Sequence, residues 1–362
     1  MRNGAKAALW LGVAGAATFA ATRLATRREA NLADHVVLIT GGSRGLGLLM
    51  AEEFAHQGCR IAICARDPDE LERARLRLRS LTPHVLAVTC DVSQEDEVLR
   101  MVAEVEARFG RVDVLVNNAG IIQVGPVSAM TAQDFETIMA VNFFGAVYTT
   151  LAVLPGMRER GYGRLVTIDS IGGRVAAPHM LPYDASKFAL RGFSEGLRAE
   201  LDQDGIAVTT VLPGLMRTGS PENALFKGQQ AAEYTWFAIA DSLPLLSMDA
   251  RKAARRIVKA CRRGEAELTL TLRARLIGRL HDLSPSLTMS LFALVNRVMP
   301  SGDGASEGTA RGMDLVSPLA PSWLTSWTTE AAKQTNQYGG RHEPSPTHAE
   351  RIGLTPRKRR EG

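Results

Sequence analysis

A glycine-rich turn near the start of the chain constrains the fold more than any other feature of the sequence. The turn runs from Thr40 to Gly47 and reads Thr-Gly-Gly-Ser-Arg-Gly-Leu-Gly. It follows an apolar run typical of a strand, residues 35–40, and opens a helical pattern of apolar residues over 46–57. Bare backbone in a strand-to-helix turn lets a pyrophosphate approach the helix N-terminus and its unpaired N–H groups. The sequence therefore predicts a dinucleotide-binding α/β domain.

A second pattern lies in the middle of the chain. Tyr183 and Lys187 stand four residues apart, and Ser170 precedes the tyrosine by thirteen positions. On a helix, positions i and i+4 share one face, with Cβ atoms roughly 5–6 Å apart. A free phenol has a pKa near ~10, and a neighbouring cation lowers it. We therefore expect Lys187 to lower the pKa of Tyr183, so that this tyrosine exchanges a proton with a carbonyl or alcohol oxygen.

With these motifs the chain resembles the short-chain dehydrogenase/reductase family over residues 34–271. The spacing Gly-x-x-x-Gly-x-Gly is that of the compact single-domain branch and differs from the Gly-x-x-Gly-x-x-Gly of the extended epimerases and dehydratases. Further family marks stand in the expected order: Asp91, Asn117-Asn118-Ala119-Gly120, Asn142, Pro213-Gly214 and Thr218. The resemblance implies a Rossmann-type, doubly wound parallel sheet of about seven strands with helices on both faces.

The order of apolar runs along the chain agrees with such a sheet, because strands alternate with helical patterns. We expect strands at 35–40, 59–64, 84–89, 112–117, 163–169, 206–212 and 266–271, and helices near 68–80, 94–109, 131–158, 181–203 and 249–263. Residues 215–247 read as a long irregular insert containing Trp236 and Phe237. By resemblance this insert forms the lid of the substrate pocket, and its apolar character favours an apolar substrate.

The resemblance implies a role for each candidate catalytic residue. Tyr183 would be the general acid for reduction and the base for oxidation, while Lys187 would lower its pKa and hold the nicotinamide ribose. Ser170 would donate a hydrogen bond to the substrate oxygen. Asn142 matches the residue that binds a water between Lys187 and solvent, although it also fits a polar group satisfied within its helix. Asp169 departs from the Ser or Asn that the family often carries there.

Cofactor choice depends on the end of the second strand. NAD enzymes place an acid there for the ribose 2′-OH, whereas an arginine accommodates a 2′-phosphate. This chain has Ala65 in the acid's place and Arg66 after it, with Arg44 in the glycine turn. Two planar cations suit a phosphate, so NADP (NADPH) is favoured, although Asp67 stands next to Arg66. The expected cofactor-binding residues are Gly41, Ser43, Arg44, Gly45, Leu46, Gly47, Arg66, Asp91, Val92, Asn118, Ala119, Gly120, Tyr183, Lys187, Pro213, Gly214 and Thr218.

Composition limits the partners of the protein. The net charge of +5 is spread out, and its one dense basic run, 356–360, reads as a solvated tail, so we expect no nucleic-acid partner. The four cysteines form no Cys-x-x-Cys pair, which fits a reducing compartment, and no spacing of metal ligands accompanies them. We expect a small-molecule substrate and a homodimer or homotetramer.

The surplus over one typical domain lies at both ends of the chain. Residues 1–30 contain an uncharged stretch, 7–22, flanked by basic residues, and three interpretations compete: a membrane anchor, a secretory signal and a mitochondrial-type presequence. The additional arginines after the stretch would leave the catalytic domain on the cytoplasmic side, attached to the membrane through this segment.

The C-terminal surplus has two parts. Residues 272–300 form two amphipathic helical segments that would pack on their own domain, cover a partner or lie in a membrane interface. Residues 301–362 are expected to be disordered, apart from a short element around 323–327.

Three functions compete on this sequence. The first is an NADP(H)-dependent carbonyl reductase or alcohol dehydrogenase for a ketosteroid-like, long-chain or polyketide-like ketone. The second is a non-catalytic NADP-binding sensor or scaffold, which the intact set of Asn142, Ser170, Tyr183 and Lys187 disfavours. The third is a membrane-associated partner protein in which the C-terminal helices matter more than catalysis.

Overall fold

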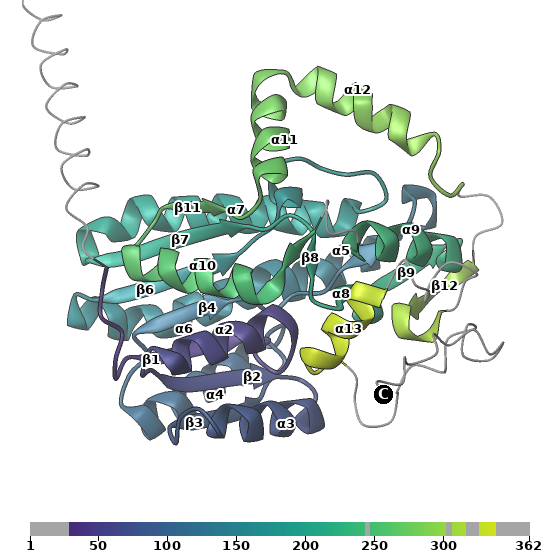
Figure 1. Ribbon diagram of the computed structural model, residues 1–362. Coiled ribbons are helices and arrows are strands. Elements are labelled where there is room, and N and C mark those ends of the chain that lie inside the picture. The colour runs from purple at the N-terminus through teal and green to yellow at the C-terminus, as the bar shows by residue number, and fades with distance from the viewer. Residues whose placement is uncertain (1–28, 243–246, 302–305, 316–325, 338–362) are drawn as a thin grey trace, which may run out of the picture.

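The centre of the molecule is a seven-stranded parallel sheet, seen in a computed structural model that describes residues 29–242, 247–301, 306–315 and 326–337 (Figure 1). Its strand order is β11-β7-β6-β4-β1-β2-β3. The strands are β1 (Val36–Thr40), β2 (Arg60–Ala65), β3 (Val85–Thr89), β4 (Val114–Asn117), β6 (Gly163–Ile168), β7 (Ile206–Leu212) and β11 (Glu267–Thr269). The predicted doubly wound sheet is confirmed.

Helices cover both faces of this sheet because its strands carry apolar residues on both sides. In β1, Val37 and Ile39 belong to the core on one face, and Val36 and Leu38 to the core on the other. The first face is covered by α2 (Gly45–His56), α3 (Pro68–Arg79) and α10 (Ala250–Arg263), and the second by α4 (Glu95–Phe109), α6 (Gly145–Arg160) and α7 (Leu181–Leu201).

The region predicted as an irregular insert folds into defined elements. It contains β8 (Met216–Arg217), α8 (Ser220–Asn223), β9 (Leu225–Gly228) and α9 (Gln230–Ser242), and residues 243–246 lie outside the described residues. Strand β9 lies between β5 (Gln123–Val124) and β12 (Ser306–Arg311) in a second, three-stranded sheet. Phe237 is 3% exposed and packs in a small core of this lid. The lid is therefore a compact unit with its own apolar centre.

Two helices project from the body after β11 (Figure 1). They are α11 (Leu272–Leu283) and α12 (Pro285–Asn296). Their large apolar side chains are exposed rather than packed on the domain: Leu272, Leu276, Ile277, Leu280, Leu283, Leu287, Met289, Leu291, Leu294 and Val295, with Val298 just after. We predicted that this segment packs on its own domain, covers a partner or lies in a membrane interface. The exposure of these side chains does not agree with the first of these alternatives.

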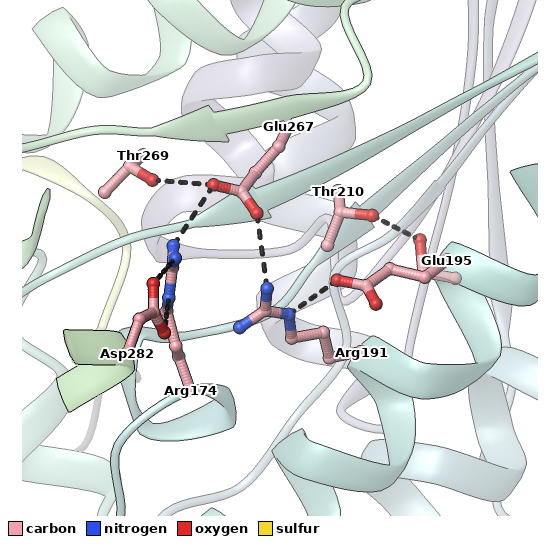
Figure 2. Close-up of polar contacts among 8 residues, drawn as sticks. Arg174, Arg191, Glu195, Thr210, Glu267, Thr269 and Asp282 are labelled. Atoms are coloured by element: carbon pink, nitrogen blue, oxygen red, sulfur yellow. Dashed lines mark hydrogen bonds and ion pairs between the residues drawn. The ribbon is translucent and has the colours of Figure 1, made fainter. Parts of the chain in front are cut away.

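A polar network ties the C-terminal end of α11 to the body (Figure 2). Arg174 pairs with Asp282 of α11 and approaches Glu267 of β11 at 3.5 Å. Arg191 of α7 reaches the other oxygen of Glu267 at 3.5 Å and pairs with Glu195 at 2.7 Å. The arginines thus join α11, α7 and the edge strand, which orients the exposed helix pair.

The C-terminal region differs from the predicted disorder. It contains β12, a 3₁₀ turn (Gly312–Asp314) and α13 (Ser326–Gln334), all placed against the lid or the glycine turn. The prediction of disorder is therefore wrong for 306–315 and 326–337, because pairing with distant residues orders them. Most of the element expected at 323–327, the tail from 338 and the segment 1–28 lie outside the described residues.

One continuous helical stretch within the described residues, Ala132–Arg160, is long and apolar enough to cross a membrane. Half of its most apolar window is buried inside the molecule, where α6 contacts α4. This stretch contains α5 (Ala132–Met139), a π-helical turn (Ala140–Phe144) and α6. We interpret it as a core helix of the domain.

Candidate active site

The glycine turn joins β1 to α2 through backbone conformations and close approaches that require glycine. Gly41 and Gly45 have φ of +64° and +57°, a region that residues with a Cβ rarely adopt. A Cβ at Gly47 would lie 2.2 Å from the carbonyl oxygen of Gly41, so only glycine fits. The predicted residues of the turn thus form the bare cradle that a dinucleotide requires.

The loop after β4 braces this cradle. Asn118 donates from Nδ2 to the carbonyls of Thr40 (2.9 Å) and Gly41 (3.0 Å), and the Thr40 hydroxyl accepts from the amides of Asn118 and Ala119 at 3.0 Å. The hydroxyl of Thr40 therefore connects the ends of two neighbouring strands. Thr40 belongs to the predicted motif, but the motif does not predict this role for its hydroxyl.

Asn142 continues this connection toward α7. Its side chain accepts from the amide of Ile121 (2.8 Å) and donates to the Ile121 carbonyl (3.1 Å) and to Ser186 Oγ (2.9 Å). Asn142 lies in a π-helical turn, a feature that is frequent at functional sites, and its side chain connects Ile121 to Ser186. Asn142 is 1% exposed and adjoins Gly120, whose Cβ would stand 3.3 Å from its Oδ1.

Ser170, Tyr183 and Lys187 meet where β6 ends beside α7. Ser170 follows β6, and its Oγ accepts from the amide of Gly172 at 3.0 Å. The Lys187 ammonium lies 5.7 Å from the centre of the Tyr183 ring and donates to the carbonyl of Ile168 at 2.9 Å. The Ser170 side chain also lies near enough to Tyr183 to act on the pKa of its phenol. The three predicted residues are therefore brought together.

Burial controls the charges of this group. It raises the pKa of Tyr183 well above its ordinary value, and the neighbouring Ser170 side chain acts in the opposite direction. Burial also lowers the pKa of Lys187, which the nearby Asp169 carboxylate partly offsets. The expected lowering of the Tyr183 pKa is therefore wrong for the chain alone, because removal from water outweighs the effect of Ser170, and Asp169 and Asp184 raise the pKa further.

Two acidic side chains lie beneath the group. Burial raises the pKa of Asp169 to about 7, and the Lys187 ammonium pulls it down. Burial raises the pKa of Asp184 to about 8, and a hydrogen bond from the Ala177 amide pulls it down. Each carboxylate occupies the space beside a glycine. A Cβ at Gly173 would lie 2.5 Å from Asp169, and a Cβ at Gly172 would lie 2.3 Å from Asp184. These glycines let the loop after Ser170 close over two carboxyl groups.

The remaining predicted cofactor residues lie around the same edge of the sheet. The Pro213 carbonyl accepts from the amide of Ile171 at 2.8 Å, so the end of β7 adjoins Ser170. Gly214 contacts Thr271, and Thr218 is 6% exposed. Val92 packs on Gly145, and Leu46 is buried in α2.

The two arginines proposed for the 2′-phosphate differ in their surroundings. The Arg66 side chain is 56% exposed, and its guanidinium is 3.8 Å from the Asp91 carboxylate. Arg44 donates to Glu70 (2.8 Å) and to Asn223 (2.9 Å), and Ser43 also donates to Glu70. Asp67 accepts from the amide of Glu70 as the N-cap of α3, so its carboxylate is already engaged. Glu70 could not be recognised as part of the site from the sequence, because a glutamate in the first turn of a helix is an ordinary stabilising residue.

Comparisons with known proteins agree with this geometry. The sequence model described as short chain dehydrogenase matches residues 35–225. A dehydrogenase/reductase SDR family protein 7-like from Anopheles gambiae is 37% identical over 268 residues, covering 72% of this chain and 83% of the relative. The 11-beta-hydroxysteroid dehydrogenase 1A of Arabidopsis thaliana is 39% identical over 203 residues, or 55% of this chain and 57% of the relative.

Solved structures are similar as well. A short-chain dehydrogenase from Streptomyces avermitilis has a TM-score of 0.64 and 32% identity, covering 73% of this chain and 98% of its own. The L-sorbose reductase of Gluconobacter frateurii, complexed with NADPH and L-sorbose, has a TM-score of 0.60 and 28% identity, covering 67% and 97%. The chain belongs to the short-chain dehydrogenase/reductase family, whose members are nicotinamide-dependent oxidoreductases.

Proposed function

We propose that this protein is an NADP(H)-dependent oxidoreductase that interconverts a carbonyl and a secondary alcohol. The observation that carries the proposal is the meeting of Ser170, Tyr183 and Lys187 beside a glycine cradle that admits no side chain. A bound nicotinamide supplies or accepts the hydride. The residues of this chain hold the cofactor, orient the substrate oxygen and move the proton.

Tyr183 is the proton donor in reduction. Because burial raises its pKa, the phenol keeps its proton at neutral pH and can deliver it to a carbonyl oxygen as negative charge develops there. Ser170, beside Tyr183, supplies a second donor to the same oxygen. Asn142 positions α7 through Ser186, the neighbour of Lys187.

The preference for NADP rests on the end of β2. Ala65 stands where an acid would bind the ribose 2′-OH, and Arg66 offers an exposed guanidinium there. Arg44 is the second candidate, and it would have to share its charge between Glu70 and a phosphate. Arg66 is therefore the main determinant in this proposal.

An apolar substrate is supported by the relatives rather than by the lid. Phe237 is used in the lid's own core, and Trp236 donates from Nε1 to Glu233 at 2.7 Å. The relatives include proteins named 11-beta-hydroxysteroid dehydrogenase and a putative ketoacyl reductase. We propose a ketosteroid-like, long-chain or polyketide-like ketone as substrate.

The test is a screen for NADPH oxidation over ketones, sugars and acyl thioesters, with the Tyr183→Phe protein assayed in parallel. Turnover of a ketone by the parent and loss of that turnover in the variant support the proposal. Tight NADPH binding without turnover of any compound would instead favour a cofactor-binding scaffold.

We also propose that the protein is membrane-associated on the cytoplasmic side. The exposed leucines of α11 and α12 are accompanied by the exposed basic residues Arg273, Arg275, Arg279 and Arg297, which complement an anionic lipid surface. The Arg174–Asp282 pair holds this helix pair against the loop that follows Ser170. An apolar substrate dissolved in the membrane would then reach a site close to the bilayer.

Self-association is a further part of the proposal. Helices α6 and α7 leave Leu151 and Phe188 exposed, and Phe144 just before α6 is exposed as well. Exposed apolar side chains grouped on neighbouring helices are typical of an interface between copies of a chain. We propose a homodimer or homotetramer, which light scattering of the purified protein would test.

A further inference from the structure

The end of the described chain lies against the glycine turn. Helix α13 contacts α8 of the lid (Figure 1), and three residues follow it, Thr335, Asn336 and Gln337, here called the inserted segment. Thr335 and Gln337 are each 4% exposed. The inserted segment is therefore buried in the body of the protein.

The inserted segment contacts the amide that opens α2. The first hydrogen bond within this helix runs from the Leu48 amide to the Arg44 carbonyl, so the amides of residues 45–47 have no partner inside the helix. Such amides at a helix N-terminus are the groups that bind the phosphates of a dinucleotide. The Gly45 amide donates instead to the Thr335 carbonyl at 2.9 Å. A peptide oxygen of this chain thus stands where a pyrophosphate oxygen would accept.

Gln337 fills the space between the glycine turn and the lid. Its Nε2 lies 3.0 Å from the position that a Cβ on Gly45 would take, and it donates to the Thr218 carbonyl at 2.8 Å. The Thr335 hydroxyl donates to the same carbonyl at 2.9 Å. The proposed function places the dinucleotide between Gly45 and Thr218. The inserted segment and the dinucleotide therefore cannot occupy this space together.

The same contacts extend to the arginine of the glycine turn. Asn223 donates to the Gln337 side chain at 2.8 Å and accepts from Arg44 at 2.9 Å. The Glu70 carboxylate pairs with Arg44 at 2.8 Å, and the Glu70 carbonyl accepts from Asn336 at 3.0 Å. Arg44 is thus held by partners of the inserted segment, so a 2′-phosphate would have to compete with them.

Asn336 secures the inserted segment. Its φ of +59° is left-handed, a conformation that asparagine tolerates better than most residues with a Cβ. Its Nδ2 donates to the carbonyls of Ser43 (2.8 Å) and Glu70 (3.0 Å), and its Oδ1 accepts from Arg73 at 2.9 Å. Replacement by alanine would remove all three hydrogen bonds and make the backbone conformation less favourable.

A dinucleotide has one advantage over the inserted segment. The segment contacts Gly45, Ser43 and Thr218 through neutral groups, whereas a phosphate is charged, and charge-assisted hydrogen bonds are roughly twice as strong as neutral ones. A dinucleotide can therefore displace the segment, but part of its binding free energy is used to do so. Its apparent affinity is reduced by the fraction of molecules in which the site is open.

We infer that the inserted segment is an autoinhibitory element, which occupies the dinucleotide site and must leave before the cofactor binds. This inference rests on the proposed function in that the dinucleotide is NADP(H). Asn336 and Gln337 position the segment and contact no reacting atom.

The first experiment is a fluorescence titration of the full-length protein with NADPH. Loss of one neutral hydrogen bond corresponds to a change of about 3- to 10-fold in an equilibrium constant. Because the variants open the site, we expect Gln337→Ala to bind NADPH about 3- to 10-fold more tightly than the parent. Asn336→Ala should gain at least as much, since it loses more contacts.

Gln334→Ala is the matched control. Gln334 belongs to α13 and is exposed, and its side chain donates to Glu330 within the same helix. This variant should bind NADPH with the parental affinity. Unchanged or weaker binding by both Asn336→Ala and Gln337→Ala would overturn the inference, because the inserted segment would then not compete with the cofactor.

The second experiment measures hydrogen exchange in the peptide that covers residues 326–337. Saturating NADPH should accelerate exchange there in the parent, because the cofactor displaces the inserted segment. Unchanged or slower exchange would show that segment and cofactor are bound together, which overturns the inference.

The two experiments separate this inference from the proposed function. If NADPH binds and accelerates exchange at 326–337 but no carbonyl compound is reduced, the proposed reductase fails and the inference stands. If NADPH is turned over but the variants bind it like the parent, the inference fails alone. If neither the parent nor the variants bind NADPH or NADH, both fail.

Discussion

The ammonium of Lys187 lies 5.7 Å from the centre of the Tyr183 ring, and burial shifts the pKa of both groups toward the neutral form. Removal from water disfavours the charged form of each group, so it opposes both phenolate and ammonium. The arrangement keeps the proton on the phenol, where a reductase needs it. Oxidation of an alcohol would require that proton to be lost first.

Tyr183→Phe should retain NADPH binding and lose at least about 100-fold in turnover, since general acid catalysis contributes about 10²–10⁴-fold. Because burial raises the pKa of Tyr183, reduction should stay nearly constant through neutral and mildly alkaline pH, while oxidation should accelerate as pH rises. Rate profiles in both directions check this. An oxidation rate that falls with increasing pH would contradict the assignment.

Cofactor choice should depend more on Arg66 than on Arg44. Arg66→Ala deletes a charged partner of the 2′-phosphate, which contributes about 1.5–3 kcal/mol, or roughly ten- to more than a hundredfold in affinity. Arg44→Ala should cost less, because Arg44 is already engaged by Glu70 and Asn223. Arg100→Ala, an exposed arginine on α4, is the control. The measurement is the ratio of NADPH to NADH dissociation constants, and a parent that binds NADH equally well would disprove the preference.

The glycine cradle can be tested by comparing two glycines. Gly47→Ala places a methyl 2.2 Å from a backbone oxygen and should cost about 1–3 kcal/mol of stability together with cofactor binding. Gly192→Ala lies within α7, where a Cβ meets nothing within 4 Å, and should add up to about 1 kcal/mol through helix propensity. Urea unfolding of the two variants checks both signs. Normal NADPH binding by Gly47→Ala would contradict the role of the turn.

The sheet and the catalytic residues could be predicted because their signals are local. Short apolar runs indicate the strands, and the i, i+4 spacing of Tyr183 and Lys187 predicts that both lie on one face of a helix. The π-helical turn at Asn142 left no mark on the periodicity of 131–158, because one extra residue per turn hardly changes an apolar pattern. The single helix predicted over 131–158 is therefore divided in the structure into α5, a π-helical turn and α6.

The lid sheet and the order of residues 326–337 could not be predicted from local signals. Strands β5, β9 and β12 are short and pair across large separations in the chain, so neither their length nor their pattern identifies them. Asn336 and Gln337 stand in a polar, low-complexity stretch that reads as disorder. Their order comes from contacts with Ser43, Glu70 and Thr218, which only the folded chain brings near.

Stability should fall as pH rises from about 4 to 8. Burial raises the pKa of Asp241 to about 8, as it does for Asp184, whereas an unfolded aspartate has a pKa near ~3.9. Between these values the folded chain holds a proton that the unfolded chain has released, so raising the pH favours unfolding by up to about 1.4 kcal/mol per unit for each group. Asp241→Asn should flatten the dependence of the urea midpoint on pH. Asp241 lies in α9, so the variant leaves Tyr183 and Lys187 in place. A midpoint that rises with pH in the parent would contradict the assignment.

Membrane association can be tested without removing the C-terminal region. Deleting 272–362 would also remove β12 and α13, which pack on the lid, so point variants in α11 and α12 test the membrane contact more directly. We expect the full-length protein to sediment with vesicles that contain anionic lipid. Leu283→Glu combined with Leu294→Glu should weaken this binding, because both side chains are more than half exposed and an apolar contact with lipid would be replaced by repulsion from its charge.

Two weak attachments bind far more stably than either one alone, so the double variant should release only part of the protein. Removing residues 1–28 from that variant should release the remainder, because the uncharged stretch 7–22 is the second predicted attachment. Leu76→Glu combined with Leu99→Glu is the matched control, since these exposed leucines lie on α3 and α4 of the domain body. This control should sediment like the parent. If the full-length protein stays in the supernatant with vesicles present, the apolar faces of α11 and α12 do not bind lipid and must be covered by another partner.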